Sequence, residues 1–317
     1  MTHAATIPEP QTPPAEVSTQ ADSAPAVRRR GLTPVIGSYL DLAKARIVFL
    51  VLITTACGYL TGAQRVEAGT LINVLLGTAL LAAGTNGLNL YVERELDAKM
   101  NRTRSRPLPE GRISPRAALL FSSGIAIIGT AYLALAVNWL SAALGLFTLM
   151  SYVFVYTPLK RMSTINTLVG AIPGAVPPLI GWTAATGSLG FGGWIAFGIV
   201  FLWQLPHFMA ISWLYREDYA RGGFRMLAVE DRDGRAVASQ ALWYSIALVP
   251  VTLAPTFAGL AGPYYLAGAV LGVTAMIVAS IRFLRDRSKG PARALFMISN
   301  LFLLTMMLLL VVDVRIP

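Results

Sequence analysis

The chain has 317 residues, of which 55% are hydrophobic and only 13% charged, and its net charge is +10. This composition is too apolar for an ordinary soluble protein. The chain has one cysteine, Cys57, and two histidines, His3 and His207. These counts exclude an intrachain disulfide, covalent haem attachment through a Cys-x-x-Cys-His motif, and a histidine-rich metal site.

Residues 1–32 are predicted to form a disordered tail. Five prolines stand among Ala, Thr and Ser, and no hydrophobic period is present. The tail lacks the apolar core of a signal peptide, and Glu9, Glu16 and Asp22 are atypical of a mitochondrial transit peptide. We therefore expect a protein of the bacterial plasma membrane, in which residues 33–317 form one intramembrane domain.

Nine apolar segments are long enough to cross a bilayer. They cover about residues 44–62, 71–92, 116–137, 139–157, 164–186, 191–214, 238–260, 263–284 and 292–312. The predicted fold is therefore all-α, a polytopic membrane bundle of nine transmembrane helices.

Lys and Arg are divided unequally between the two ends of these spans. Of the 26, only Arg65 and Arg315 fall on one side, and the other 24 fall on the opposite side. The positive-inside rule makes the rich side cytoplasmic, with the N-terminus inside and the C-terminus outside. Because loop charges of this kind explain the net charge, we expect no nucleic-acid partner.

A polar row at the end of the second span is the strongest candidate for a catalytic site. If the helix continues through Asp97, then Asn89, Glu93 and Asp97 are four residues apart and lie along one face. A cluster of Lys and Arg follows in residues 98–106. Carboxylates beside guanidinium groups suit a magnesium-bound phosphate ester. A helix end that merely reaches the membrane surface would explain the arginines but not the carboxylates, which are costly beside lipid.

Three further features lie on the fourth, fifth and sixth spans. Tyr156 and Lys160 are four residues apart, which fits either anion binding or interfacial anchoring. The fifth span is rich in Pro and Gly, so we expect a bend there. His207 is the only histidine in any span. It is a candidate haem ligand or base, or else a hydrogen-bonded structural residue behind Pro206.

These motifs resemble those of a known family. The row from Asn89 to Asp97 resembles the first aspartate-rich motif, N-x-x-x-D/E-x-x-x-D, of intramembrane prenyltransferases related to the ubiquinone-pathway enzyme. Two other strings, D-A-K-M-x-R-T-x-x-R-P-L from Asp97 and W-Q-x-P-H-F around His207, most resemble the branch that farnesylates haem. The usual second D-x-x-x-D motif is missing after the sixth span, as in that branch. The resemblance covers about residues 40–310.

The resemblance implies an Mg²⁺-dependent transfer of a farnesyl group from farnesyl diphosphate to a vinyl group of haem B at the cytoplasmic face. Water then adds, and the products are haem O and diphosphate. The implied catalytic residues are Asn89, Glu93, Asp97 and Lys160. The implied metal ligands are Asn89, Glu93 and Asp97, with Asp218 as a further candidate. The implied diphosphate ligands are Lys99, Arg102, Arg106, Tyr156 and Lys160, and the implied haem ligand is His207.

Two other functions stay open at this point. One is a prenyltransferase that acts on an aromatic or quinone-precursor acceptor. The other is a transporter or haem-handling membrane protein, although transporters tend to place polar sites near the bilayer midplane. Besides farnesyl diphosphate, haem B and membrane lipids, the resemblance implies a downstream haem A synthase or terminal oxidase assembly as a partner.

Overall fold

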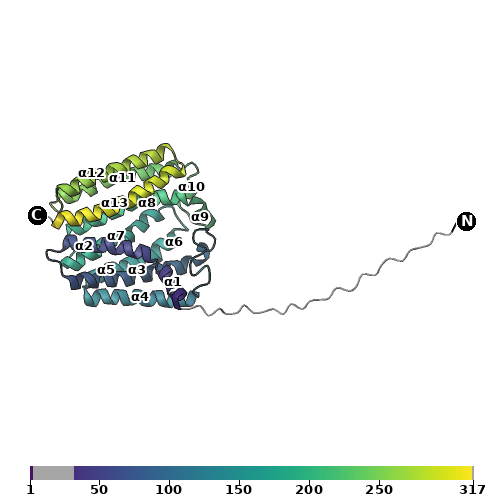
Figure 1. Cartoon of the computed structure of the whole chain (residues 1–317), viewed down its shortest axis with the longest axis horizontal. Coiled ribbons are helices and arrows are strands. Elements are labelled where there is room, and N and C mark those ends of the chain that lie inside the picture. The colour runs from purple at the N-terminus through teal and green to yellow at the C-terminus, as the bar shows by residue number, and fades with distance from the viewer. Residues whose placement is uncertain (3–31, 316–317) are drawn as a thin grey trace.

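The computed structural model describes residues 1–2 and 32–315 (Figure 1). Within this part of the chain, nine helices are long and apolar enough to cross a membrane, and no strand occurs. The predicted all-α bundle of nine spans is confirmed. Residues 3–31, which make up nearly all of the predicted tail, lie outside the described residues.

The observed spans lie within a few residues of the predicted ones. They are α2 (Ala45–Gly62), α3 (Ala68–Asp97), α4 (Pro115–Ala136), α5 with its continuation (Trp139–Leu159), α7 (Asn166–Thr186), α8 (Phe191–Leu214), α11 (Arg235–Phe257), α12 (Pro263–Arg285) and α13 (Lys289–Arg315). Four short helices lie outside these spans or end one of them: α1 (Leu32–Ala43), α6 (Thr157–Leu159), α9 (Arg216–Arg221) and α10 (Leu227–Glu230).

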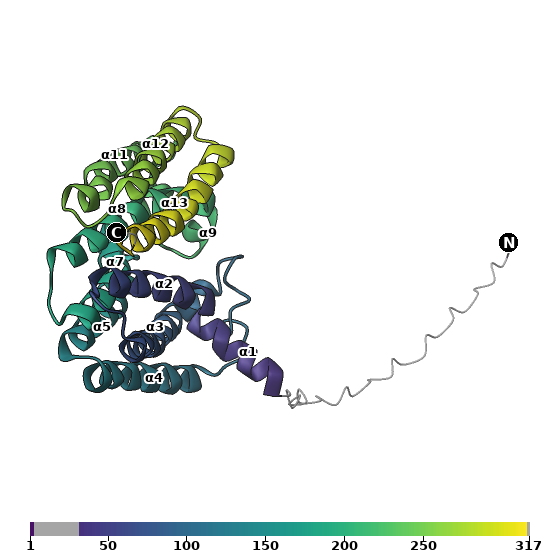
Figure 2. The same ribbon diagram turned by 60° about the vertical axis from the view of Figure 1, so that its left-hand side comes forward.

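Helices α7 and α8 form the centre of the bundle. Figure 2 shows α2–α5 grouped on one side of them and α11–α13 on the other. A larger share of each central helix is buried than of any other described span. Each group packs against this centre, as α2 does against α7 and α11 against α8, and the two groups also contact each other directly through α2 and α13.

The contact between α2 and α7 depends on two glycines. A Cβ at Gly181 would lie 1.9 Å from the carbonyl oxygen of Thr55, and one at Gly58 would lie 2.0 Å from that of Pro178. No side chain fits at either distance, so the two backbones touch directly. Small residues allow such close approach between membrane helices. The contact fixes the position of α2 beside the proline-rich stretch of α7.

Helix α1 was not predicted. It carries the exposed apolar side chains Val35, Ile36 and Leu40, which suits a helix that lies in the membrane interface. It joins α2 through Lys44, the one described non-glycine residue with a positive φ, at 53°. Such a backbone conformation is uncommon for a residue with a side chain and is found at turns and functional sites.

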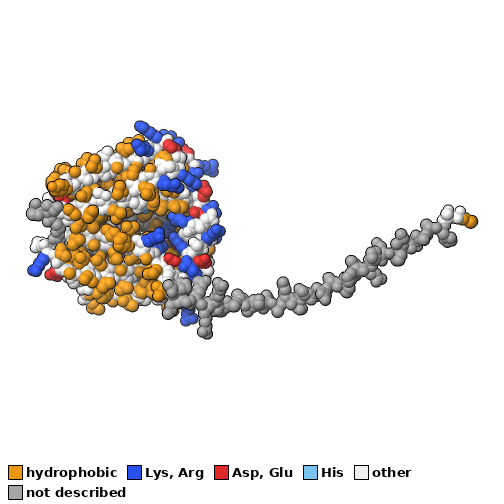
Figure 3. Space-filling view, viewed as in Figure 1, with side chains coloured by type: hydrophobic (Ala, Val, Ile, Leu, Met, Phe, Trp, Pro, Cys, Tyr) orange, Lys and Arg blue, Asp and Glu red, His pale blue; other side chains and the backbone are white. Residues whose placement is uncertain are grey.

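Charged side chains are unevenly distributed between the two ends of the molecule. Figure 3 shows Lys and Arg gathered, together with several Asp and Glu, at the end that carries α1, α6, α9 and α10, while apolar side chains cover the body. The end that carries the C-terminus of α13 shows few charges on this face. The structure therefore places the predicted basic loops at one end of the bundle.

The glycine contact leads to a test of packing. Gly181→Ala should force α2 and α7 apart and destabilise the protein by about 1–3 kcal/mol, the usual cost of overpacking. Gly124→Ala on α4 is the matched control, because nothing lies within 4 Å of its added Cβ. Thermal unfolding in detergent should show a lower midpoint for Gly181→Ala and a midpoint close to wild type for Gly124→Ala. Equal midpoints would contradict the direct backbone contact.

Candidate active site

A cavity of about 310 Å³ lies at the basic end of the bundle. Helices α2, α3 and α8, the fourth span and the segments after α3 and α9 all contribute to its wall. Seven of the ten predicted site residues line it: Asn89, Glu93, Asp97, Arg102, Arg106, Tyr156 and Lys160. The structure thus brings together two motifs that are far apart in the sequence.

Helix α3 continues through Asp97, as the row of polar residues required. Asn89, Glu93 and Asp97 are all buried, so each needs a partner for its polar atoms. Lys160 Nζ donates to Glu93 Oε1 at 2.7 Å, and Arg106 Nη1 donates to Asp97 Oδ2 at 2.7 Å. Each carboxylate of the row is therefore paired with a cation from a different part of the chain.

Asn89 links two further elements to the row. Lys44 Nζ donates to Asn89 Oδ1 at 2.8 Å, and Asn89 Nδ2 donates to Thr157 Oγ1 at 3.0 Å. Lys44 stands at the start of α2, where its left-handed backbone ends α1 and begins the next helix. One amide side chain thereby joins the first, second and fourth spans.

A π-helical turn, Ser151–Tyr156, sets the register of the fourth span. Both the backbone N–H and the hydroxyl of Thr157 donate to the carbonyl oxygen of Tyr152, five residues back. The wider turn leaves Tyr152, Tyr156 and Lys160 all in the cavity wall and brings Thr157 to Asn89. Single π-turns inside α-helices often occur at functional sites.

The charges in the cavity wall do not balance. Four basic side chains, Lys44, Arg102, Arg106 and Lys160, face two carboxylates. Burial and the nearby Arg106 guanidinium lower the pKa of Lys44 to about 7. Burial opposes the charge of Lys160 too, but the Glu93 carboxylate outweighs it and raises the pKa of Lys160 above its usual value. A cavity with surplus positive charge favours an anionic ligand.

The donor set fits a hard divalent cation that is shared with a substrate. Asp97 Oδ1 is buried and has no hydrogen-bond partner, although its other oxygen is paired. No group of three or more His, Cys, Asp and Glu residues lies close enough to hold a metal in the part of the chain that the structure describes. Magnesium is often bound by one or two carboxylates together with phosphate oxygens. Asp97, with Glu93 and Asn89 on the same face, meets that requirement.

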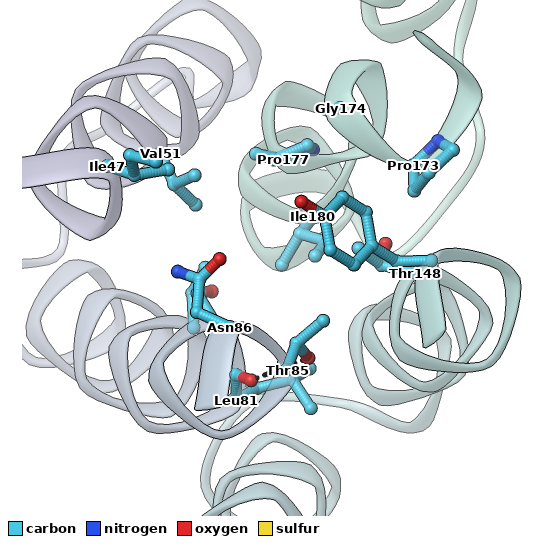
Figure 4. Close-up of a pocket in the computed structure, with 13 residues that line it drawn as sticks. Ile47, Val51, Leu81, Thr85, Asn86, Thr148, Pro173, Gly174, Pro177 and Ile180 are labelled. Carbon is cyan, nitrogen blue, oxygen red and sulfur yellow. Dashed lines mark hydrogen bonds between the residues drawn. The ribbon is translucent and has the colours of Figure 1, made fainter. Parts of the chain in front are cut away.

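An apolar cavity of about 130 Å³ lies deeper in the bundle (Figure 4). Its labelled wall residues come from α2 (Ile47, Val51), α3 (Leu81, Thr85, Asn86), the fourth span (Thr148) and α7 (Pro173, Gly174, Pro177, Ile180). Ile47 and Tyr152 line both this cavity and the polar one. A polar chamber therefore continues into an apolar one. The Pro- and Gly-rich stretch of α7 lines the apolar chamber.

Two of the predicted anion or metal ligands lie outside the cavity wall. Lys99 is exposed on the loop after α3. Asp218, on α9, accepts a hydrogen bond from the backbone N–H of Asn101 at 3.0 Å and is paired with Arg221. Burial works against the charged form of Asp218, but these partners outweigh it and lower the pKa of Asp218 below its usual value. Asp218 thus holds the loop after α3 in place.

Arg102 connects the same loop to α9. Its guanidinium lies 4.4 Å from the ring centre of Tyr215 and 5.4 Å from that of Tyr219. It also donates to the Tyr219 hydroxyl at 3.2 Å. Cation–π contacts of this kind hold an arginine in place while its charge still acts on the cavity.

His207 does not line the cavity. Its neighbour Phe208 is in the cavity wall, whereas the imidazole packs against Phe296 and Trp203, with ring centres 4.9 and 5.2 Å away. His207 Nδ1 is 2.9 Å from Ser299 Oγ on α13. The Ser299 hydroxyl donates to the Phe296 carbonyl oxygen at 2.8 Å, which assigns Nδ1–H as the donor to Oγ. A neutral imidazole in this tautomer keeps the lone pair on Nε2.

Three residues of the site were missed from the sequence. For Lys44, the available signal was its position beside Arg46 at the start of the first span. Tyr152 and Thr157 gave no signal of their own, because the π-turn that orients them does not follow from the hydrophobic pattern. Pro158, which cannot donate a backbone hydrogen bond, was the only local hint of irregular helix geometry there.

Comparison with known proteins agrees with this geometry. The UbiA prenyltransferase family matches residues 51–304. The chain belongs to this family. Among its relatives, a protein of Solibacter usitatus named protoheme IX farnesyltransferase is 45% identical over 84% of this chain and 94% of its own. A protein of the same name from Myxococcus xanthus is 40% identical over 92% of this chain and 98% of its own.

Solved structures of this family have the same fold. A digeranylgeranylglyceryl phosphate synthase superposes with a TM-score of 0.75 at 18% identity, over 89% of this chain and 99% of its own. A UbiA homologue from Archaeoglobus fulgidus, bound to GPP and Mg²⁺, superposes with a TM-score of 0.61 at 16% identity, over 87% of this chain and 99% of its own. At these identities the likeness concerns the fold alone. Membership of a prenyltransferase family counts against the transporter alternative.

Proposed function

We propose that the protein transfers a farnesyl group from farnesyl diphosphate to a vinyl group of haem B, giving haem O and diphosphate. The observation that carries this proposal is the junction of a cationic chamber with an apolar one at Ile47 and Tyr152. A prenyl diphosphate has the same division, an anionic head joined at C1 to an apolar chain. The names of the relatives support farnesyl as the donor group and haem as the acceptor.

The diphosphate would lie among the cations of the polar chamber. Lys160 and Arg106 hold fixed positions through Glu93 and Asp97, and Arg102 is held by its tyrosine contacts. Guanidinium and ammonium groups bind phosphate oxygens through charge-assisted hydrogen bonds. Because these side chains are already ordered, little conformational entropy is lost when the substrate binds.

Asp97, Glu93 and Asn89 would hold Mg²⁺ at the same end of the chamber. When bound, Mg²⁺ neutralises the charge that develops on the leaving diphosphate. Asp97 Oδ1 is the oxygen best suited to bind Mg²⁺, because it is buried and has no hydrogen-bond partner. Arg106 donates to the other oxygen at 2.7 Å and so holds the carboxylate in position.

The chain's own residues then control the reacting carbon. C1 of the farnesyl group would lie beside Tyr152, where the two chambers meet. When the C1–O bond breaks, the electron pair leaves with the diphosphate toward Lys160 and Arg106, and the face of the Tyr152 ring attracts the allylic cation. The apolar wall formed by Ile47 and α7 keeps water away from the cation.

His207 is the proposed haem ligand. Its Nε2 lone pair follows from the hydrogen bond to Ser299, which fixes the tautomer, as second-shell partners of metal-binding histidines commonly do. The residue lies one position from Phe208 in the chamber wall. An aromatic acceptor in place of haem is the competing outcome of the test below.

We also propose that the protein lies in the plasma membrane, with the N-terminus and the active site on the cytoplasmic side. The division of Lys and Arg, 24 against two, supports this orientation. On this proposal the product is delivered within the membrane to a haem A synthase or a terminal oxidase assembly.

The orientation can be tested with reporter fusions. Fusions near Arg106 and Asp233 should report the cytoplasm, because both sites lie in the basic loops. Fusions after Gly190 and at the C-terminus should report the outside. A cytoplasmic C-terminus would contradict the proposed orientation, since nine spans place the two termini on opposite sides.

The proposed Mg²⁺ site predicts the effect of removing the Asp97 carboxylate. Asp97→Asn should lower turnover at least about a hundredfold, equivalent to about 2.7 kcal/mol, because the leaving charge is less well neutralised. Glu95→Gln is the matched control, since Glu95 is on the same helix but 79% exposed and only pairs with Arg94. Turnover is measured against Mg²⁺ concentration in detergent. Near wild-type turnover of Asp97→Asn would remove this residue from the site.

If His207 binds haem, its removal should weaken haem binding selectively. His207→Ala should lose haem binding, seen in an optical titration, while farnesyl diphosphate still binds, because Lys160 and Arg106 are unchanged. Ser299→Ala keeps the imidazole but removes its hydrogen-bond acceptor, so haem binding should weaken less. Loss of both ligands together with a lower protein yield would instead indicate a structural role. Transfer to an aromatic acid, with haem left unmodified, would favour the other acceptor class.

A further inference from the structure

A third cavity, of about 180 Å³, lies beside the active-site chamber. It is bounded by the start of α7, by α8, by α10 and by the cytoplasmic part of α11. The polar residues in its wall are Thr164, Thr167, Gln240 and Tyr244. The function proposed above uses none of them. Its volume is enough for several water molecules, and its hydroxyl and amide groups offer the hydrogen bonds that enclosed water needs.

Thr167 lines both this cavity and the active-site chamber. It is buried, with 8% of its surface exposed, and lies between the two spaces. Its neighbour Asn166 is held by hydrogen bonds to the carbonyl oxygens of Ser163 and Arg225, at 2.6 and 2.9 Å. The partition is therefore a fixed part of the α7 N-terminus.

The three cavities form a series. The apolar chamber meets the active-site chamber at Ile47 and Tyr152, and the polar side cavity meets it at Thr167. The active-site chamber thus has an apolar neighbour that excludes water and a polar neighbour that can hold it. This arrangement separates the allylic cation from a source of water while keeping that source within reach.

We propose that the polar side cavity supplies, past Thr167, the water that completes the reaction; this inference rests on the function proposed above. The C1–O bond breaks, diphosphate leaves with the electron pair, and the vinyl π electrons then form a bond to C1 of the allylic cation. The resulting cation, on the former vinyl carbon next to the porphyrin ring, takes the lone pair of a water oxygen. The added water then loses one proton to the next water in the side cavity, and the product is an alcohol.

Without water from the side cavity, the same cation gives a different product. It loses a proton from the neighbouring carbon and gives an alkene, which lacks one water relative to the alcohol. Both products require farnesyl transfer, but only the alcohol requires water at the right moment. The ratio of the two therefore reports on water delivery independently of transfer.

The test measures this ratio by mass spectrometry after turnover with haem B, farnesyl diphosphate and Mg²⁺ in detergent. Thr167→Val keeps the volume of the partition but removes its hydroxyl. Gln240→Leu with Tyr244→Phe removes two of the four polar groups in the wall of the side cavity. Each variant should raise the alkene-to-alcohol ratio at least about tenfold, with total transfer nearly unchanged. Thr148→Val is the matched control, because Thr148 lines the apolar chamber, and its ratio should stay at the wild-type value.

The outcomes are distinct. An unchanged ratio in both side-cavity variants, with full transfer, would overturn the water route and leave the proposed function standing. A parallel fall of alkene and alcohol would assign these residues to folding or to transfer itself, which also overturns the route. Absence of any farnesylated porphyrin from the wild-type enzyme would instead overturn the proposed function.

Discussion

The active site depends on the burial of two carboxylates at the end of a membrane helix. A buried charge without a partner costs several kcal/mol, and near lipid the cost is higher still. Glu93 and Asp97 are tolerated because Lys160 and Arg106 reach them from the fourth span and from the loop after α3. This requirement brings two distant parts of the chain to α3, and Asn89 brings a third through Lys44. The same pairs that make the row stable place the cations where an anion can bind.

The remaining features of the site follow from that convergence. The cations exceed the carboxylates in the chamber wall, and one oxygen of Asp97 keeps unused bonding capacity. Both features would be unfavourable in a purely structural cluster, and both are satisfied by a diphosphate with its divalent cation. Tolerating unbalanced charge and an unpaired oxygen is characteristic of sites that are completed by a ligand.

Solvent control comes from the way the helices enclose space around this cluster. The direct contact at Gly58 and Gly181 holds together α2 and α7, two of the helices that line the apolar chamber. The hydrogen bonds of Asn166 hold Thr167 in the wall on the other side. An enzyme that forms an allylic cation has to exclude water from one face, and one that ends in an alcohol has to admit it at another. The polarity of the three cavities matches that division.

The sequence by itself determined the nine spans, the continuous polar row on α3 and the uneven distribution of Lys and Arg. Each of these is a local property, set by the length of an apolar run or by the 3.6-residue period of a helix. Only the tertiary structure decided which polar residues share a cavity. It brought Lys44 and Tyr152 into the chamber wall and Thr157 into contact with Asn89, and it left Lys99, Asp218 and His207 outside the wall. The reason is geometric: a π-turn, a left-handed residue and the docking of loops rotate side chains between faces without leaving a mark in the hydrophobic pattern.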